Sequence, residues 1–431
     1  MSQRRVVITG AGLISPLGNS PQALWEGLAA GRSGVVRLDS AAAEELPSPF
    51  VGRAAEFRGE IEDFGPLEKG LQRTIKKGLK LMCREIEMGV AAAQQALADA
   101  GLTAGSFDPE RTGVTFGSDF IATHPAEFAA AVRSCQDEAG DFRFGEWHTR
   151  GLPQVTPLWL LKYLPNMPAS HIAIYNDLRG PSNSITCREA SSNLSIAEAY
   201  FTIQRDHADV LVAGATGTRV HPIRSVHSAI QEQLARGEDP AKLSRPFDGK
   251  RNGMVLGEGS GAVVLELLER DQARGEKLYG EVNGYGSSSV VAGGVPDRAR
   301  ALENAFRKAL RTAGLGPHEL GHIQAHGLST TSCDREEAAA IGRVLGESRV
   351  PVAAAKANFG NLGAGSGAVE LIAGLMALAA GTLFPLLNYE QPDAECGIQP
   401  ATAETSAGEV FVNLNTTPQA QAAALVVRKF A

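Results

Sequence analysis

Three histidines of the chain have a spacing that could bind a metal ion. His318, His322 and His326 lie four residues apart. On a helix this spacing would align three imidazoles on one face as metal ligands. However, Gly321 precedes an apolar run typical of a strand, and a strand directs such side chains differently. We therefore predict no metal site, and we expect His318 and His322 to be ordinary turn and surface residues.

A glycine-containing segment near the N-terminus could bind a dinucleotide. Gly10 and Gly12 follow an apolar run, as in segments where glycines let a pyrophosphate approach the start of a helix. The third glycine of that pattern is missing, and Pro16 follows. No acidic residue ends a second strand about 20 residues further on. We interpret the segment Thr9–Ser15 as a tight structural turn and expect no nicotinamide cofactor.

Three longer glycine-rich segments also contain charged or polar side chains. Glycine lets the backbone approach a ligand closely, so such segments are candidates for a substrate site. They are Arg245–Gly261, Ala325–Thr330 and Lys356–Gly363.

The elements that would position these segments alternate along the chain. β-branched runs predict strands at Arg5–Thr9, Asp209–Ala213 and Gly261–Leu265, and alanine-rich stretches predict helices at Met88–Ala100, Leu194–Gln204 and Ala301–Ala313. The alternation indicates α/β layers. A helix, turn and strand from Leu194 to Gly214 return in the same order from Ala301 to Gln324, which suggests two related halves.

Composition narrows the classes of partner. The 431 residues are 43% hydrophobic and 21% charged, with a formal net charge of −7 and a pI near 5.8. Such a chain can form a large core but has no surplus of positive charge for nucleic acid or an anionic bilayer. The five cysteines are scattered without a CxxC pair, so neither disulfides nor a zinc site is predicted. We expect a cytoplasmic protein.

No segment has the composition expected of a signal peptide or a membrane-spanning helix. The first apolar run, before Gly12, is too short for a secretory signal. The stretch Val369–Leu387 is interrupted by Glu370 and Pro385 and falls short of about 20 apolar residues. We predict a buried helix that continues into a strand.

The glycine-rich segments, taken together, resemble a known family. With Gly180–Ser184 and Val212–Thr216, they are similar to the successive signature segments of the type II β-ketoacyl-acyl-carrier-protein synthases. The resemblance extends from Arg5 to about Glu370, and more weakly to the end. It implies a duplicated thiolase-like α/β fold with five layers, αβαβα. We expect an N-terminal half at residues 1–258 and a C-terminal half at residues 259–431.

The resemblance places a glutamate where the family has its nucleophile. These enzymes hold an acyl chain as a thioester on a cysteine at the N-terminus of a buried helix. Counting eight residues forward from Pro181, or 25 residues backward from Gly214, gives Glu189 both times. A glutamate cannot perform the cysteine's role. We expect it to accept backbone hydrogen bonds and to pair with a cation, for which protonated His326 is the natural candidate.

Cys187 is the alternative nucleophile, because it lies two residues before Glu189. Two residues at the start of a helix correspond to about 200° of rotation, which would direct its sulfur away from the family's pocket. We interpret Cys187 as a small buried hydrophobic residue.

Other positions of the family site are partly kept. The resemblance implies that His326 is the first of two catalytic histidines and that Lys356, Glu337 and Glu370 occupy family positions. The second histidine is replaced by Asn361, which can donate a hydrogen bond but cannot shuttle a proton.

Substrate-binding positions also differ from the family pattern. Of two threonines associated with the phosphopantetheine arm, Thr330 remains and the other is Leu328. The glycine-rich gate loop of the family is replaced by Asn413–Gln421, which contains no glycine, so the same oxyanion hole is not expected. Thr416 and Thr417 of this loop are expected at the substrate site.

These differences favour a non-condensing partner in fatty acid or polyketide assembly, similar to chain-length-factor subunits. Three alternatives stay open. They are a malonyl-carrier-protein decarboxylase, an active 3-oxoacyl synthase with a displaced nucleophile, and a binding protein for acyl chains or carrier protein without turnover. The family activity is acyl transfer, and the competence of this chain is doubtful.

The resemblance also implies partners. Substrates would arrive on the phosphopantetheine of an acyl carrier protein, and the chain needs no cofactor of its own. We expect a homodimer, or a heterodimer with an active ketosynthase. For the segment Phe142–Met167, with Trp147 and Trp159, core packing is expected, and a tunnel wall or a dimer contact is the alternative.

Overall fold

The computed structural model describes residues 4–39, 44–270 and 277–430. Most of its strands follow one hydrogen-bonded order, β13-β12-β11-β14-β15-β8-β1-β7-β6-β4-β5, while β3 (Phe50–Gly52) joins β2 (Val35–Arg37) to β7 beside it. The strands of the N-terminal half are β1 (Val6–Ile14), β4 (Thr112–Ser118), β5 (Ser182–Thr186), β6 (Val210–Thr218) and β7 (Leu256–Leu267). Those of the C-terminal half are β8 (Gly280–Ser289), β11 (His322–Gln324), β12 (Pro351–Ala353), β14 (Val410–Thr416) and β15 (Gln421–Arg428), with β13 (Gln399–Pro400) at the edge.

The two halves have the same strand topology. In each half three neighbouring strands are parallel, in the order β5-β4-β6 in one half and β12-β11-β14 in the other, where the short β13 adds in parallel beyond β12. Each sheet then continues through two antiparallel strands, β7 and β1 in one half and β15 and β8 in the other. This repetition confirms the predicted duplication. The predicted boundary between residues 258 and 259 lies inside β7, a strand that pairs with β1 and β6 of the N-terminal half.

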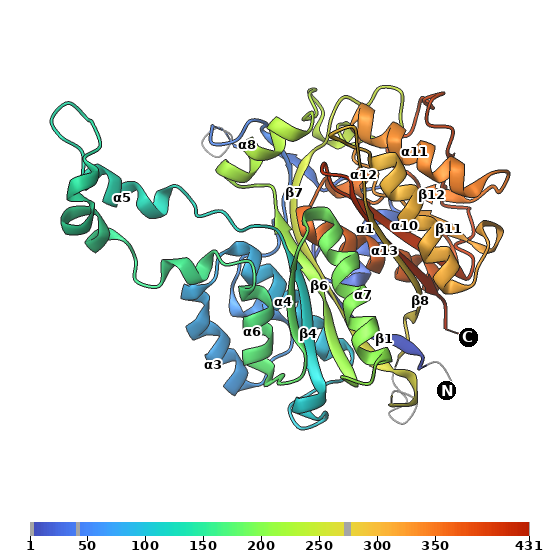
Figure 1. The fold of residues 1–431 in the computed structure, drawn as a ribbon, viewed down its shortest axis with the longest axis horizontal. Coiled ribbons are helices and arrows are strands. Elements are labelled where there is room, and N and C mark those ends of the chain that lie inside the picture. Colours follow the sequence, from blue (N-terminus) through green and yellow to red (C-terminus); the bar gives the residue numbers. More distant parts are fainter. Residues whose placement is uncertain (1–3, 40–43, 271–276, 431) are drawn as a thin grey trace.

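Helices form three layers around these sheets (Figure 1). Helices α7 (Ser191–Gln204) and α13 (Ser366–Ala380) pack against each other between the sheets, while α4 (Arg84–Asp99) covers β1 and α10 (Arg298–Ala313) covers β8. The remaining helices are α1 (Pro21–Ala29), α3 (Lys69–Gly78), α5 (Ala126–Ser134), α6 (Met167–Asn176), α8 (Pro222–Gln231), α11 (Thr331–Leu345) and α12 (Lys356–Phe359). The predicted five-layered α/β fold is therefore present.

One detail of the predicted repeat was wrong. Helix α10 lies between β8 and β11, as α4 lies between β1 and β4. The true counterpart of α7 is α13, because each precedes the third parallel strand of its half. The local helix, turn and strand patterns are alike, and only the order of strands in the sheet identifies the matching pair.

The predicted turn at Thr9–Ser15 was also wrong, because β1 runs through both glycines. A Cβ on Gly10 would lie 2.2 Å from the carbonyl oxygen of Ala96, and one on Gly12 would lie 2.2 Å from that of Ala92. The glycines therefore allow α4 to pack directly on the strand. The turn follows at Ser15, which exchanges backbone hydrogen bonds with Gly18.

The histidine triplet does not form a metal site. No cluster of at least three histidine, cysteine or acidic residues suited to a metal occurs among the described residues. The expectation that His322 lies at the surface was wrong. This side chain is fully buried in β11, stacks on Phe411 at 5.0 Å between ring centroids, and hydrogen-bonds the Ala407 carbonyl at 2.8 Å.

Helix α13 belongs to the stretch 363–380, which is long and apolar enough by composition to cross a membrane, but 83% of this stretch is buried inside the protein. It is a core helix, as predicted. No strand directly follows it in the described chain, where the next strand is β13.

The segment Phe142–Met167 was wrongly predicted to pack in the core. Most of it belongs to an arm, residues 122–162, that carries α5 and extends away from the body (Figure 1), whereas Tyr163 and Met167 at its end pack against the core. Phe144 is 78% exposed and Leu158 is 64% exposed. Ring contacts between Phe128 and Trp159 and between Phe142 and Trp147 hold the arm together internally.

Candidate functional site

Glu189 lies at the start of the central helix α7. After β5 the chain passes through Arg188, whose φ of 52° is in the left-handed region, into a short 3-10 helix, Arg188–Ala190. The Ser191 hydroxyl accepts the Cys187 N–H at 2.8 Å and donates to the Ser118 carbonyl at 3.0 Å. These two hydrogen bonds fix the start of the helix so that the Glu189 side chain points into the interior, where the residue is 3% exposed.

The cation that pairs with Glu189 is Arg219. Asp119 and Arg219 directly follow β4 and β6, which are neighbouring parallel strands, so both lie at the same sheet edge. One guanidinium nitrogen of Arg219 pairs with Glu189, and the other lies 2.8 Å from Asp119. Asp119 in turn pairs with Arg224. These four side chains form a buried line of alternating charge.

This arrangement keeps Glu189 ionised. Burial acts to raise the pKa of Glu189, but the charges of Arg219, Arg188 and their surroundings outweigh it and hold the pKa well below its usual range. The pKa of Asp119 is lowered in the same way, against burial, by Arg219 and Arg224. Glu189 is thus a fixed carboxylate rather than a proton donor.

The expectation that protonated His326 pairs with Glu189 was wrong. Burial and the nearby Lys356 lower the pKa of His326 well below its ordinary value, so the imidazole is neutral. Lys356 donates to the His326 carbonyl at 2.8 Å and pairs with Glu370, whose other oxygen accepts from Asn415 at 2.7 Å. Lys356 therefore provides the positive charge next to His326, and a second positive charge on the imidazole is unfavourable.

Asn361, at the position of the second histidine, donates to Glu189. Its side-chain nitrogen lies 3.2 Å from the glutamate oxygen, while its own oxygen accepts from Gly363 at 3.0 Å and from Ser366 at 3.3 Å. The donor that could polarise a thioester carbonyl is therefore already bonded to the protein's own carboxylate.

Acidic side chains hold the loop that follows β11. Glu337 accepts the N–H groups of His326 and Gly327, both at 2.7 Å, and burial raises its pKa to about 8. Thr330 caps α11 by accepting the Cys333 N–H at 3.3 Å. Lys356 and Thr330 thus stabilise neighbouring segments without lining the cavity, whereas Leu328 lines it.

The structure brings six of the predicted residues around one small cavity. Arg188, Met254 and Arg298 are among the other lining residues. The cavity encloses only about 10 Å³, roughly the space that one water molecule needs. An acyl chain therefore has no room beside Glu189 in this structure. The six are Glu189, His326, Leu328, Asn361, Thr416 and Thr417.

The glycine-free loop forms a tight hairpin turn between β14 and β15. The N–H of Ala420 donates to the Thr417 carbonyl at 3.0 Å, and the N–H of Thr417 donates to the Gln421 carbonyl at 2.9 Å. Ala420 takes the left-handed conformation with a φ of 56°. Thr416, Thr417 and Pro418 close the cavity from this side.

Cys187 does not line this cavity. It is half-buried, and burial raises the pKa of its thiol, which opposes formation of a thiolate at neutral pH. Its thiol makes no hydrogen bond with the residues that the structure describes, and Ser191 bonds only its backbone N–H.

Sequence reasoning missed Asp119, Arg219 and Arg224, which are as buried as Glu189. A signal for two of them was present. Asp119 and Arg219 each follow an apolar strand directly, and charged residues at the ends of neighbouring parallel strands meet at one sheet edge. Recognising this required knowing that the two strands are neighbours.

The duplicated αβαβα architecture, with Glu189, His326 and Lys356 gathered at the start of a buried central helix, defines a thiolase-like protein. The chain belongs to the β-ketoacyl synthase family. Residues 3–271 match the family's "Beta-ketoacyl synthase, N-terminal domain", and residues 279–390 match its "Beta-ketoacyl synthase, C-terminal domain".

Curated relatives are similar over almost the whole chain. A "3-oxoacyl-[acyl-carrier-protein] synthase 2" of Synechocystis is 32% identical, covering 97% of this chain and 95% of the relative. A "Granaticin polyketide putative beta-ketoacyl synthase 1" of Streptomyces violaceoruber is 34% identical, covering 93% and 92%. Both relatives carry synthase names from fatty acid or polyketide assembly.

Solved structures agree on the fold. A β-ketoacyl synthase from Burkholderia phymatum has 27% identity and a TM-score of 0.84, covering 99% of this chain and 100% of that one. The "ishigamide ketosynthase/chain length factor" has 25% identity and a TM-score of 0.82, with both chains fully covered. A ketosynthase in complex with a type II polyketide acyl-carrier protein reaches a TM-score of 0.84 at 22% identity, with both chains fully covered, and supports the fold alone.

Proposed function

We propose that this chain is a non-condensing subunit of a β-ketoacyl synthase dimer in fatty acid or polyketide assembly, similar to a chain-length factor. The observation that carries the proposal is the ion pair between Glu189 and Arg219 at the nucleophile position. It replaces a reactive thiolate with a neutralised carboxylate in a cavity of about 10 Å³.

The chemistry of the site supports this role. Condensation needs a nucleophile that holds an acyl chain as a thioester, and an acyl group on Glu189 would be a hydrolysable anhydride. Decarboxylation of a malonyl thioester needs hydrogen-bond donors for the developing negative charge. Asn361 already donates to Glu189. The nucleophile for condensation is therefore replaced, and one donor that decarboxylation would use is already bonded to the protein.

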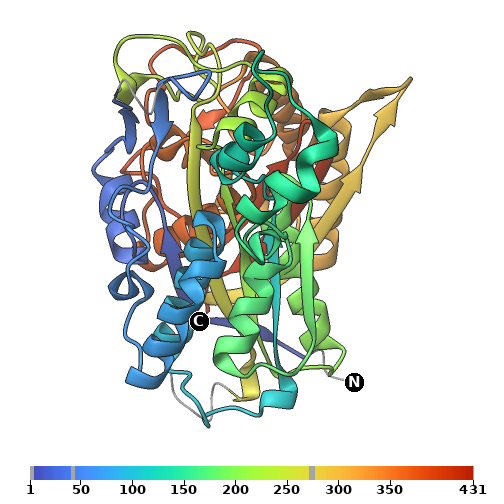
Figure 2. The same ribbon diagram turned by 90° about the vertical axis from the view of Figure 1, so that its left-hand side faces the viewer.

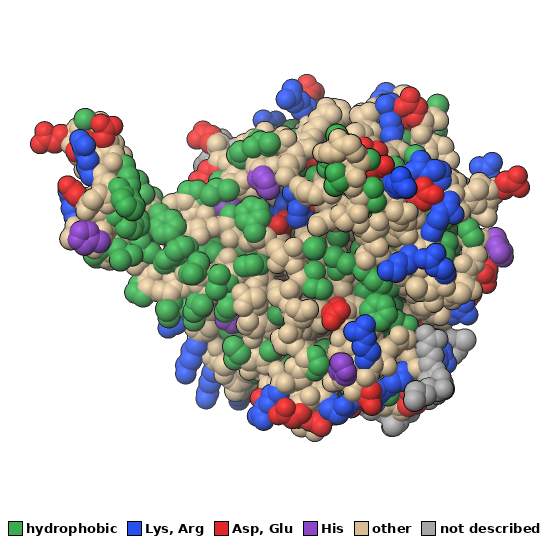
Figure 3. Space-filling view, in the orientation of Figure 1, with side chains coloured by type: hydrophobic (Ala, Val, Ile, Leu, Met, Phe, Trp, Pro, Cys, Tyr) green, Lys and Arg blue, Asp and Glu red, His purple; other side chains and the backbone are tan. Residues whose placement is uncertain are grey.

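The molecule presents a surface suited to a second subunit. Strand β5 is an edge strand whose residues are exposed or half-buried, so its backbone can pair with another strand. The arm extends from the same side of the molecule (Figure 2). Its hydrophobic side chains form a continuous exposed band, and exposed arms of this kind are stabilised by a partner (Figure 3).

Acyl carrier protein is the second partner in the proposal. Helix α3 exposes Lys69, Arg73, Lys76 and Lys77, a positive surface that could attract an acidic protein or the phosphate of phosphopantetheine. Among solved relatives, one ketosynthase is described in complex with its carrier protein. The proposed location of this assembly is the cytoplasm.

The test is intact-protein mass spectrometry combined with product analysis. The purified chain is incubated with carrier protein bearing a long acyl chain and then with malonyl-carrier protein. We expect no covalent adduct, no elongated product and no carbon dioxide. The same assay with a co-expressed active synthase should give elongation, with the acyl adduct only on the synthase.

Two outcomes would contradict the proposal in distinguishable ways. An adduct on Cys187 with a product two carbons longer would establish a condensing enzyme with a displaced nucleophile. Release of carbon dioxide without elongation, lost in the variant Asn361→Ala, would establish a decarboxylase.

A further inference from the structure

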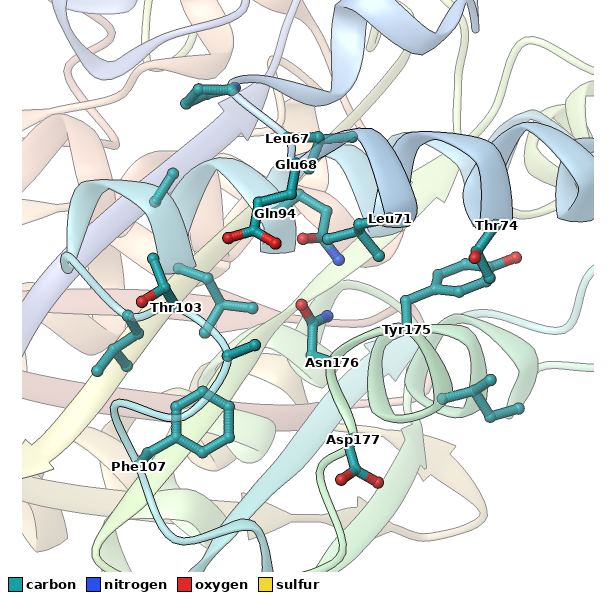
Figure 4. Close-up of a pocket in the computed structure, with 16 residues that line it drawn as sticks. Leu67, Glu68, Leu71, Thr74, Gln94, Thr103, Phe107, Tyr175, Asn176 and Asp177 are labelled. Carbon is teal, nitrogen blue, oxygen red and sulfur yellow. The ribbon is translucent and has the colours of Figure 1, made fainter.

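A second and much larger cavity lies on the outer face of the N-terminal half. It encloses about 450 Å³ between α3, α4 and α6, within the range of small-molecule sites. Figure 4 shows side chains from these three helices and from the segment after α4 around one space. None of its lining residues belongs to the cavity beside Glu189. It is therefore separate from the site at Glu189 that carries the proposed function.

The walls of this cavity are mostly apolar. Four leucines and the ring of Phe107 face the space beside Tyr175, and they would exclude water from the body of a bound molecule. These residues are Leu67, Leu71, Leu97, Leu102 and Phe107.

One buried polar group lacks a partner within this cavity. Gln94 projects from α4 toward the middle of the space (Figure 4) and is 3% exposed. Its side-chain nitrogen makes no hydrogen bond with the described residues. Buried donors are almost always paired in native proteins, so this donor is available to an acceptor on a molecule that enters the cavity.

The charges around the cavity restrict the ligand further. Glu68 and Asp177 line it, and no lysine or arginine is among its lining residues. Asp177 pairs with Arg179 at 2.8 Å, whereas no ion pair is recorded for Glu68 within the described chain. The lining therefore offers no cation that could pair with an anionic ligand such as a fatty acid or a phosphate ester.

We propose that this cavity binds a neutral, largely apolar molecule whose carbonyl oxygen accepts a hydrogen bond from the side-chain nitrogen of Gln94. The apolar body of the ligand lies against the leucines and Phe107. The ligand class is a neutral ketone or amide with a hydrocarbon or aromatic body.

The proposal is tested with two fluorescent probes on the full chain. The neutral naphthyl ketone 6-propionyl-2-(dimethylamino)naphthalene has an apolar body and one carbonyl, and 1-anilinonaphthalene-8-sulfonate is its anionic counterpart. We expect saturable, blue-shifted emission of the ketone, without displacement by an equal concentration of the sulfonate.

Three variants localise the binding. Gln94→Leu keeps the size of the side chain but removes the donor, and should weaken ketone binding roughly three- to tenfold. Leu71→Trp fills the space and should weaken binding at least about tenfold. The control Ile230→Trp, at a position that is 78% exposed on α8, should leave the affinity unchanged.

Folding of the variants is checked independently by thermal unfolding without probe. There Gln94→Leu should raise the melting temperature, because it removes an unpaired buried donor. The proposal is overturned if the ketone does not bind saturably, if Leu71→Trp binds it like the wild type, or if the sulfonate displaces it. Unchanged affinity in Gln94→Leu would overturn the assigned hydrogen bond and with it the ligand class.

Discussion

At the scale of single residues, the buried carboxylate of Glu189 is stable only if groups from other segments replace its hydration. Removing an ionised carboxylate from water costs several kcal/mol unless a cation and hydrogen bonds replace the solvent. Arg219 and Asn361 provide both, and Asp119 and Arg224 complete the neutralisation. The substitution at the nucleophile position is thus part of a set of residues that must occur together.

Removing the arginine alone should therefore be severe. Arg219→Met leaves Glu189 and Asp119 buried without their shared cation, and we expect the free energy of unfolding to fall by about 3–5 kcal/mol. The double variant Glu189→Met with Arg219→Met should recover most of this loss, because Arg224 still pairs with Asp119. Urea unfolding at pH 7.5 measures both.

The matched control is Arg307→Met, which breaks a surface pair with Glu303 whose arginine is 48% exposed. It should cost less than about 1 kcal/mol. Equal losses in Arg219→Met and Arg307→Met would show that the buried ion pair has no special role in stability.

A second residue-scale prediction concerns Glu85, which accepts the Thr218 N–H at 3.0 Å. Burial raises the pKa of Glu85 to about 7 from an ordinary value of 4.5. The folded state therefore binds more protons than the unfolded state between these values, and its stability falls as the pH rises through this window. The shift corresponds to on the order of 2–3 kcal/mol between pH 5 and pH 8.

The variant Glu85→Gln keeps an acceptor for Thr218 but cannot ionise. Its free energy of unfolding, relative to that of the wild type, should increase from pH 5 to pH 8. Other buried acids, such as Glu337, are present in both proteins and cancel in this difference. A difference that is constant with pH would mean that Glu85 titrates normally.

At the scale of elements, the packing of α4 on β1 depends on the absence of side chains at two glycines. Gly12→Ala would place a Cβ 2.2 Å from the Ala92 carbonyl oxygen, so the helix would have to move. We expect a loss of about 1–3 kcal/mol, measured by denaturant unfolding.

The control for this prediction is Gly342→Ala, within α11, where a Cβ would meet nothing within 4 Å. Because alanine favours a helix over glycine, this change should stabilise the protein by about 0.5–1 kcal/mol. If both substitutions were neutral, close helix-to-strand packing would not explain the glycine of β1.

At the scale of the whole molecule, the arm and the β5 edge are the surfaces through which we propose that a second subunit binds. Phe142 and Phe144 are 44% and 78% exposed, and other large apolar side chains continue along the arm. Leaving such a surface in water is unfavourable, whereas burying it between subunits contributes favourably to association.

The double variant Phe142→Ser with Phe144→Ser should weaken dimer formation by roughly tenfold or more, as expected for aromatic anchors of an interface. Sedimentation velocity of the chain alone, and with a co-expressed synthase, measures this. The control Val291→Ser with Val295→Ser changes two valines that are 63% and 65% exposed on the hairpin of β9 (Val291–Ala292) and β10 (Val295–Pro296). Equal effects of the two double variants would contradict an arm-mediated interface.

The sequence by itself determined the family, the α/β layers and the position of the unusual glutamate. These follow from local features: apolar periodicity, glycine-rich segments and the constant spacing around Glu189. Local features are encoded by neighbouring residues, so they can be read without coordinates. The presence of Asn361 and the loss of glycine from the gate loop were visible for the same reason.

Only the tertiary structure decided how these residues are paired. Arg219 and Asp119 are 30 and 70 residues from Glu189 in the chain, and they meet it because β4 and β6 are neighbours in the sheet. His326 is neutral because it is buried and because Lys356 reaches it from another segment, and neither condition can be read from its neighbours in the sequence. The exposure of the arm was equally inaccessible, because an apolar pattern does not distinguish burial in a core from burial against a partner.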